Sequence, residues 1–299
     1  MSIVLSIVAV WVIGVTVFQL TCFSIALYEA LNLPETRHTR LTGTGLVQAL
    51  VGFAVEIGGV LVMLLAWPLG LLPWSAPGRA RPGDRPPVIF VPGWWMNRAC
   101  LYVLRSRLRR DGWRHTVGFN YRTAYGDIRV AAEELRDVIE RTCQATGSDR
   151  VVLIGHSMGG LVCRAYLKHH EGLRRVASVV TLGTPHQGSK LCALSLDPMA
   201  QDMRPESAFL EELATDDPIP GAADFTAIYS SFDHLVVPAA HAYYAGVGNI
   251  LVEGVGHNGL LWSSRVYELI RENLEYGSAT EAETPPPAPP SLHEAGEGH

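Results

Sequence analysis

The sequence predicts an α/β domain, with a mostly parallel central sheet and helices on both faces, preceded by two transmembrane helices. Three observations carry this prediction. Beyond residue 87, short apolar runs alternate with segments of helical periodicity, which is the pattern of a parallel sheet covered by helices. Several apolar runs lead directly into polar residues, at the carboxyl ends of predicted strands, where open sheets place their sites. The first 74 residues contain two apolar runs long enough to cross a bilayer.

The two apolar runs occupy about residues 3–28 and 45–72 and predict a membrane anchor over residues 1–74. No Lys or Arg precedes the first run, which is also longer than the apolar region of a cleaved signal peptide. The second run is interrupted by Glu56. For this carboxyl group we favour a structural role over a proton- or substrate-binding role. In the structural role it is protonated, faces the partner helix or a second subunit, or lies near an interface. The short polar segment between the runs makes the pair a helical hairpin, with both ends on one side of the membrane.

The arginines around the two runs indicate an orientation. Arg37 and Arg40 flank the hairpin loop, whereas Arg79, Arg81 and Arg85 follow the second run. The positive-inside rule therefore favours a cytoplasmic position for the following domain, by one arginine and the N-terminal amine.

Residues 75–87 are rich in Pro, Gly and Arg and form a predicted linker to a domain over residues 88–276. Within the domain, apolar runs bounded by turn residues predict strands at 88–91, 117–121, 151–154, 176–182, 225–229 and 249–253. Apolar residues repeating every three or four positions predict helices at 98–111, 128–145, 161–168 and 263–274. Residues 187–224 are irregular except for a short helical pattern at 207–214, and a loop of that length in a compact domain is usually functional. Residues 277–299, rich in Pro, Glu, Ala and Gly, form a predicted disordered tail.

Charge and cysteine content exclude several classes of function. The formal net charge is −5, and no basic cluster with interleaved aromatic residues is present, so nucleic acid is not an expected partner. The five cysteines are scattered, odd in number and lack a C-x-x-C pair, which predicts neither a disulfide framework nor a zinc site. No run of alternating carboxylates of the EF-hand kind occurs. We therefore expect no metal and no required cofactor.

The pattern around Ser157 indicates the chemistry. Residues 151–160 read VVLIGHSMGG, so a buried strand runs through G-x-S-x-G straight into a predicted helix. Such an elbow exposes the serine at its tip, and Gly155 and Gly159 are needed where strand and helix nearly touch. The helix N-terminus directs backbone N–H groups at the serine and favours an oxyanion beside it. Ser157 is therefore the predicted nucleophile.

This elbow, with VIFVPG at 88–93 before it and TPHQG at 184–188 after it, resembles the α/β-hydrolase fold and, within it, the bacterial lipase and esterase family that includes triacylglycerol lipases. The resemblance covers about residues 85–275, and neither the anchor nor the tail. It implies an ester hydrolase that forms an acyl-enzyme on Ser157. Together with the two apolar runs, a bacterial resemblance predicts a multi-pass protein of the bacterial inner membrane. In lipases the region corresponding to residues 187–224 commonly carries the lid.

In this fold the partners of the serine follow it in the order acid, then histidine. Asp233 comes after the strand predicted at 225–229, and His257 comes after the strand predicted at 249–253. The resemblance implies that His257 takes the proton of Ser157 and returns it to the leaving alcohol, while Asp233 orients the imidazole and stabilises its cation. Taken singly, the aspartate could be a turn former and the histidine an exposed loop residue. Their order and context favour the triad.

An oxyanion hole needs two backbone N–H groups, which the resemblance assigns to Met158, directly after the serine, and to Trp94, in the loop after the first strand of the domain. The family usually has His-Gly before the second donor, whereas this chain has Pro-Gly before Trp94, so a supporting histidine is absent. We expect Trp95 and His186 to line the substrate pocket, with a place in the core as the alternative for Trp95.

These observations predict a membrane-anchored, lipase-like serine carboxylester hydrolase, whose partners are a lipid ester of medium to long chain and the membrane. One alternative keeps the acyl-enzyme but transfers the acyl group to an alcohol or another lipid instead of water. Another is a catalytically silent hydrolase domain that serves as a membrane interaction module, against which the complete set of Ser157, Asp233 and His257 argues. The sequence carries no indication of oligomeric state.

Overall fold

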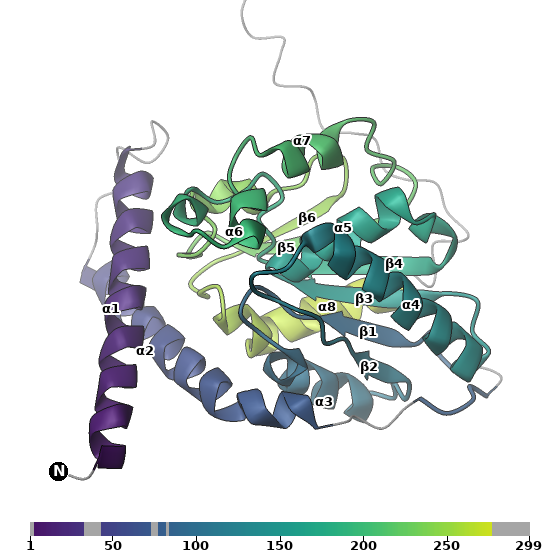
Figure 1. Cartoon of the computed structure of the whole chain (residues 1–299), viewed down its shortest axis with the longest axis horizontal. Helices are drawn as coiled ribbons and strands as arrows, with labels where there is room; N and C mark the ends of the chain where they lie inside the picture. The colour runs from purple at the N-terminus through teal and green to yellow at the C-terminus, as the bar shows by residue number, and fades with distance from the viewer. Residues whose placement is uncertain (1–2, 33–42, 73–76, 82–83, 277–299) are drawn as a thin grey trace, which may run out of the picture.

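The computed structural model describes residues 3–32, 43–72, 77–81 and 84–276. These residues form a six-stranded sheet between layers of helices, and a pair of long apolar helices stands at one side of this domain (Figure 1). The predicted α/β architecture with a parallel sheet is confirmed. The tail predicted at 277–299 and the loop of the predicted hairpin lie outside the described residues.

The strands of the sheet are β1 (Val88–Val91), β2 (Thr116–Gly118), β3 (Val151–His156), β4 (Val176–Leu182), β5 (Asp224–Ser230) and β6 (Gly248–Val252). Their spatial order is β2-β1-β3-β4-β5-β6, and every neighbouring pair is parallel. All side chains of β1 and β3 are buried, because helices cover both faces of the sheet. Instead of the 117–121 predicted, β2 covers 116–118, since its pairing with β1 ends where Gly118 meets Phe90.

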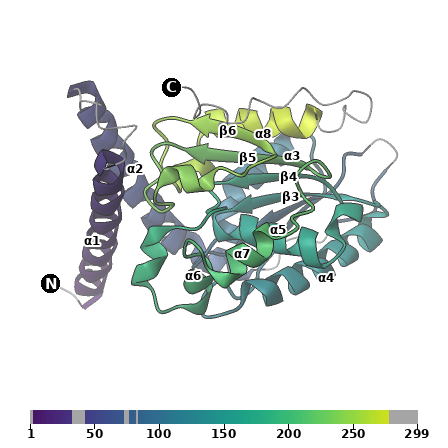
Figure 2. The same cartoon turned by 90° about the horizontal axis from the view of Figure 1, so that it is seen from above.

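The helices of the domain divide between the two faces of the sheet (Figure 2). One face is covered by α4 (Ile128–Thr146) and α5 (Met158–His169), and the other by α3 (Tyr102–Arg110) and α8 (Ser264–Tyr276). The start of α4 is capped by the Asp127 carboxylate, which accepts a hydrogen bond from the N–H of Arg129, and its end is marked by Gly147 at φ 74°. The helix predicted at 98–111 instead begins as a 3-10 turn, η2 (Arg98–Leu101).

In the region 187–224, the helical pattern predicted at 207–214 corresponds to α7 (Ala208–Ala214). The part predicted as irregular also contains two short helices, η4 (Lys190–Leu194) and α6 (Pro198–Asp202). Phe209 and Leu213 of α7 are buried in the same core as α4 and α5. Behind α7, Asp217 forms a buried ion pair with Arg164 of α5, with an N–O distance of 3.0 Å. The later part of this region is therefore fixed to the domain by apolar packing and by a buried charge pair.

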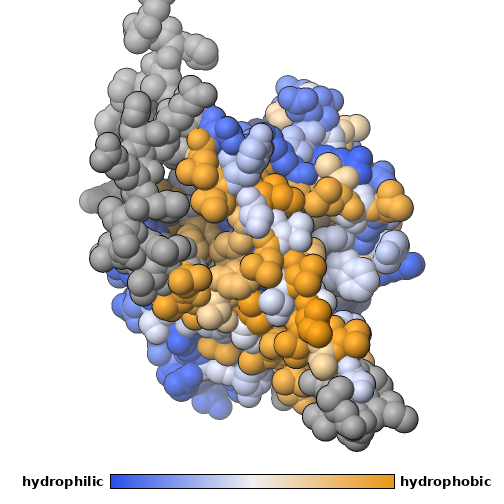
Figure 3. Space-filling view, turned by 90° about the vertical axis from the view of Figure 1, so that its left-hand side faces the viewer, coloured by the Kyte–Doolittle hydropathy of each residue, from blue (hydrophilic) through white to orange (hydrophobic). Residues whose placement is uncertain are grey.

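The helices predicted as the anchor are α1 (Ile3–Asn32) and α2 (Gly43–Ala66), which continues into η1 (Trp67–Leu71). Both are long and apolar enough to cross a membrane. They contact one another through Phe23 and Phe53, whose ring centroids lie 5.1 Å apart. Asn97 and Asn120 of the domain donate hydrogen bonds to backbone carbonyls of η1, which fixes its position. The outward surfaces of the pair are apolar and exposed, and a broad hydrophobic face results (Figure 3).

Three further short helices complete the described chain: η3 (Gly172–Arg174), η5 (Ala239–Ala242) and η6 (Gly259–Leu261). Of these, η6 follows the loop after β6 and lies against α2. The pair of α1 and α2 thus reaches the edge of the sheet at which the strands end.

Candidate active site

Ser157 stands at a strained turn between β3 and α5. Its backbone has φ 54° and ψ −128°, a conformation that side-chain-bearing residues rarely adopt outside functional sites. A Cβ on Gly155 would lie 2.8 Å from the backbone of Gly160, and a Cβ on Gly159 would lie 2.2 Å from the carbonyl oxygen of Val91. Both glycines are therefore required because strand, turn and helix approach too closely for a side chain, as the sequence predicts.

Asp233 and His257 form a buried pair. Nδ1 of His257 lies 2.7 Å from Oδ2 of Asp233, while Oδ1 of Asp233 accepts the N–H groups of Leu235 and Val236, each at 2.8 Å. Burial opposes ionisation of Asp233, but the charge and hydrogen bond of His257 outweigh it and hold the pKa of that carboxyl below its ordinary value. Burial likewise opposes the His257 cation, yet Asp233 outweighs it and raises the imidazole pKa.

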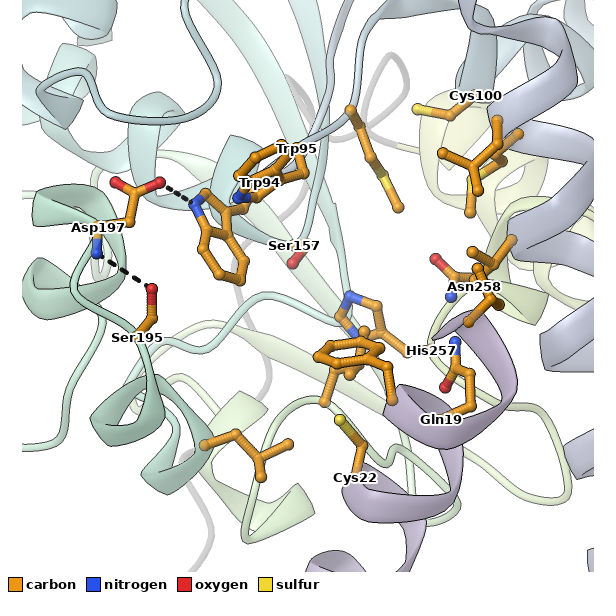
Figure 4. A pocket seen from close by; sticks show the side chains of 18 of the residues that line it. Gln19, Cys22, Trp94, Trp95, Cys100, Ser157, Ser195, Asp197, His257 and Asn258 are labelled. Carbon is orange, nitrogen blue, oxygen red and sulfur yellow. Dashed lines mark hydrogen bonds between the residues drawn. The ribbon is translucent and has the colours of Figure 1, made fainter. Parts of the chain in front are cut away.

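The ends of β3, β5 and β6 bring the three predicted residues to one place. Ser157 and His257 line the same cavity (Figure 4). Asp233 contacts His257 through Nδ1 of the ring. A Cβ on Gly183, at the end of β4, would lie 3.2 Å from both Oδ2 of Asp233 and Nδ1 of His257. Gly183 thus leaves room for the pair, a function that the sequence alone did not reveal.

The two predicted oxyanion donors lie beside the serine. A Cβ on Gly93 would lie 2.8 Å from Cβ of Ser157, so the loop carrying Trp94 runs directly against the elbow. The N–H of Trp94 donates no hydrogen bond within the described part of the chain. Met158 is the first residue of α5, where a backbone N–H has no partner inside the helix. Both groups therefore have unused hydrogen-bonding capacity next to Ser157.

Asp197 is a residue of this site that the sequence did not single out. Its Oδ2 accepts hydrogen bonds from Nε1 of Trp94, at 2.8 Å, and from the N–H of Tyr125, at 3.0 Å (Figure 4). Its Oδ1 caps α6 through the N–H of Met199. The position before Pro198 indicates a helix cap, but nothing local indicates the bond to Trp94. Asp197 thereby holds the indole of Trp94 in one orientation.

A cavity of about 870 Å³ opens above the serine and is enclosed largely by apolar side chains. Trp11 and Phe18 of α1 and Met63 of α2 line this cavity. Gln19 and Cys22 of α1 lie on one side of it, and Trp94 and Trp95 of the loop after β1 lie on another (Figure 4). Trp95, predicted to line the substrate pocket, lines this cavity, and its side chain remains 59% exposed. Among the described residues, no cluster of three or more His, Cys, Asp or Glu side chains is arranged to hold a metal ion.

His186 lies outside this cavity, which differs from its predicted place. Its ring is buried and stacks on Tyr244, with 4.6 Å between centroids, and its Nε2 lies 3.1 Å from Oγ1 of Thr181. Burial holds the pKa of His186 well below its ordinary value, so the ring is a neutral core group. The preceding residue, Pro185, contributes to the cavity wall instead.

The arrangement of strands, elbow and flanking loops matches known proteins. A family model described as alpha/beta hydrolase fold matches residues 86–216. Aspergillus fumigatus lipase B superposes with a TM-score of 0.60 at 22% identity, over 68% of this chain and 55% of that chain. The protein has the α/β-hydrolase fold. The mature form of Bacillus licheniformis lipase BlEst2 shares this fold, with a TM-score of 0.56 at 16% identity, over 67% of this chain and 96% of that chain.

The α/β-hydrolase domain is also similar in sequence to named enzymes. GPI inositol-deacylase of Candida albicans is 25% identical over 184 residues, which is 55% of this chain and 42% of that protein. Triacylglycerol lipase of Pseudarthrobacter phenanthrenivorans is 41% identical over 70 residues, which is 23% of this chain and 21% of the lipase. The similarity spans less than half the length of these relatives.

Proposed function

We propose that this protein is a membrane-anchored serine carboxylester hydrolase that cleaves lipid esters. One observation carries the proposal: a single apolar cavity contains Ser157 and His257 and has α1 and α2 as its wall. An ester with a long acyl chain can bury that chain in the cavity, where each methylene removed from water contributes about 0.8 kcal/mol. The similarity to triacylglycerol lipases and to a deacylase supports the same class of reaction.

The proposed reaction starts with proton transfer from Ser157 to His257. Because Nδ1–H of His257 donates to Asp233, Nε2 is the base. The serine oxygen bonds to the ester carbonyl carbon, and the carbonyl oxygen becomes an oxyanion that accepts the N–H groups of Met158 and Trp94. The bond to the alcohol breaks, and His257 returns the proton to that alcohol. Water then attacks the acyl-enzyme by the same route and releases the carboxylic acid and free serine.

The anchor places this cavity at a lipid surface. The exposed surfaces of α1 and α2 are apolar. An apolar surface of this extent is stable only when lipid or another apolar surface covers it. Because the same helices line the cavity, a lipid has a short apolar path from the bilayer to Ser157. A water-soluble acetyl ester would gain little from such a wall, so we propose lipid-like esters of medium to long chain as the substrates.

The test uses the full chain, purified in detergent and reconstituted in phosphatidylcholine vesicles. We expect it to hydrolyse p-nitrophenyl esters with rates that rise from acetyl to decanoyl, and to label with a fluorophosphonate probe. Ser157→Ala should lower turnover by about four orders of magnitude and abolish labelling while the thermal melt is retained. Preference for acetyl esters would reject lipid substrates. Failure of wild type to label would reject the serine mechanism, and acyl transfer to added glycerol in place of hydrolysis would identify a transferase.

A further inference from the structure

Glu56 is a buried carboxylate in a helix whose surface is mostly exposed. It lies in the middle of α2, and its side chain has no exposed area. Oε1 accepts the N–H of Gly259 at 2.7 Å, and Oε2 accepts the N–H of Asn258 at 3.0 Å and its side-chain Nδ2–H at 2.9 Å. Three N–H donors from one loop therefore converge on a carboxylate that lies about two hundred positions earlier in the chain.

The loop is shaped to admit this carboxylate. A Cβ on Gly256 would lie 2.3 Å from Oε1 of Glu56, and a Cβ on Gly259 would lie 3.1 Å from the same atom. A side chain at position 256 would expel the carboxylate, because 2.3 Å is far inside van der Waals contact. The glycines on either side of His257 and Asn258 therefore serve the approach of Glu56 as well as the turn itself.

His257 lies within this loop, between Gly256 and Asn258. Its ring is oriented by Asp233 through Nδ1, and its carbonyl oxygen lies 3.2 Å from Nε2 of the buried His156, which donates to it. The two backbone N–H groups that follow His257, those of Asn258 and Gly259, both donate hydrogen bonds to the carboxylate of Glu56. A displacement of about 1 Å at a reacting group lowers rates by about a hundredfold, so the position of this backbone matters for proton transfer.

We propose that Glu56 is a positioning residue for His257, and that docking of α2 thereby completes the active site. The inference rests on the proposed hydrolase function. The anchor then does more than tether the enzyme, since the carboxylate that shapes the histidine loop belongs to the anchor. Its negative charge also acts on the imidazolium, together with the larger effect of Asp233, and opposes the burial that lowers the imidazole pKa.

The test compares Glu56→Gln with wild type in the full-length, reconstituted enzyme. The amide keeps the size of the side chain, but its NH2 group then faces a backbone N–H group, so two hydrogen-bond donors oppose each other. We expect kcat on p-nitrophenyl decanoate to fall by about ten- to a hundredfold, with KM changed less than about threefold. The acid limb of the pH profile should move to lower pH, because a negative charge that favours the imidazolium is lost. Glu56→Asp should recover part of kcat.

Two variants serve as controls. Glu29→Gln removes another carboxylate of the anchor, which pairs with Lys190 at the surface, and should leave kcat and the pH profile unchanged. Gly256→Ala keeps Glu56 in the sequence but puts a methyl group where its carboxylate lies, and should reproduce the loss of kcat. This variant also tests the inference if Glu56→Gln fails to fold. An unchanged kcat and pH profile in folded Glu56→Gln or Gly256→Ala would overturn the inference.

The His257 imidazole is also titrated directly by NMR, without substrate. We expect its pKa to fall in Glu56→Gln relative to wild type, and an equal pKa would count against the inference. This measurement separates the two proposals: wild type that neither labels with fluorophosphonate nor hydrolyses any ester refutes the proposed function, whereas the NMR comparison still decides whether Glu56 acts on His257.

Discussion

Oδ2 of Asp233 lies 2.7 Å from Nδ1 of His257, and the carboxylate and the ring are both almost completely buried. This separation is that of a charge-assisted hydrogen bond, in which Nδ1–H donates. The bond leaves Nε2 unprotonated in the neutral ring. Because Asp233 is itself held by two backbone N–H groups, it cannot rotate to follow the ring, so it sets the orientation of the ring.

The first prediction concerns pH. The pKa of His257 is raised above its ordinary 6.5, and the reaction needs the neutral ring. Activity should therefore rise with pH through a midpoint above 6.5. Asp233→Asn removes the charge that favours the cation, so the midpoint should move to lower pH while turnover falls by about four orders of magnitude. Rates of p-nitrophenyl ester hydrolysis, measured over about two pH units on either side of neutrality, give this midpoint. A midpoint that does not move would assign the acid role to another residue.

The second prediction concerns Asp197. Both carboxylate oxygens of Asp197 accept hydrogen bonds from the surrounding loops. In Asp197→Asn, an amide NH2 group, which cannot accept them, replaces one of these oxygens. We expect the protein to lose about 1–3 kcal/mol of unfolding free energy. We also expect kcat to fall by about tenfold, because the loop that carries the Trp94 N–H loses its support. Asp202→Asn, in the same segment and partly exposed, is the matched control for denaturation and kinetics.

The third prediction concerns the wall formed by α1. Gly14 lines the cavity, and a Cβ built on it meets no atom within 4 Å. Gly14→Phe should fill space that an acyl chain would occupy. If room for about two methylenes is lost, the ratio of decanoyl to butyryl ester rates should fall by about tenfold. Gly58→Phe makes the same change in α2 outside the cavity lining, and should leave the ratio as in wild type.

The fourth prediction concerns stability. The Arg164 side chain is 3% exposed, pairs with Asp217 at 3.0 Å and lies over the ring of Tyr244. Arg164→Met leaves the largely buried Asp217 carboxylate without its cationic partner, with the Tyr244 hydroxyl still donating to it. This change should lower the unfolding free energy by about 3 kcal/mol. Urea denaturation of the detergent-solubilised protein measures the change. Arg174→Met breaks an exposed pair with Glu171 and should have little effect.

The fifth prediction concerns topology. By the positive-inside rule, the one additional arginine after the second apolar run predicts a cytoplasmic position for the domain that follows. A green fluorescent protein fused after Tyr276 should therefore fluoresce, and alkaline phosphatase fused there should be inactive. The opposite result would place the domain outside the cytoplasm, with the hairpin reversed.

Much of the fold follows from local patterns in the sequence. The strands at 151–156 and 176–182 are short apolar runs bounded by turn residues, and the helix at 128–146 repeats its apolar positions with helical period. Errors arise at ends, as in β2, where pairing with a neighbouring strand decides how far the strand extends. The sequence predicts His186 in the wall of the substrate pocket, but its ring is buried and stacks on Tyr244, a contact that no local pattern encodes.

The sequence by itself determined the elements that depend on neighbouring residues: the strained elbow at Ser157, the two long apolar helices, and the order in which Asp233 and His257 follow the serine. Only the tertiary structure decided that Glu56 contacts the loop after His257 and that α1 closes the cavity. These contacts join residues far apart in the chain, so no periodicity or spacing records them. In the sequence, a glycine that leaves room for a distant carboxylate, such as Gly256 beside Glu56, cannot be distinguished from a glycine that a turn requires, because both lack a side chain.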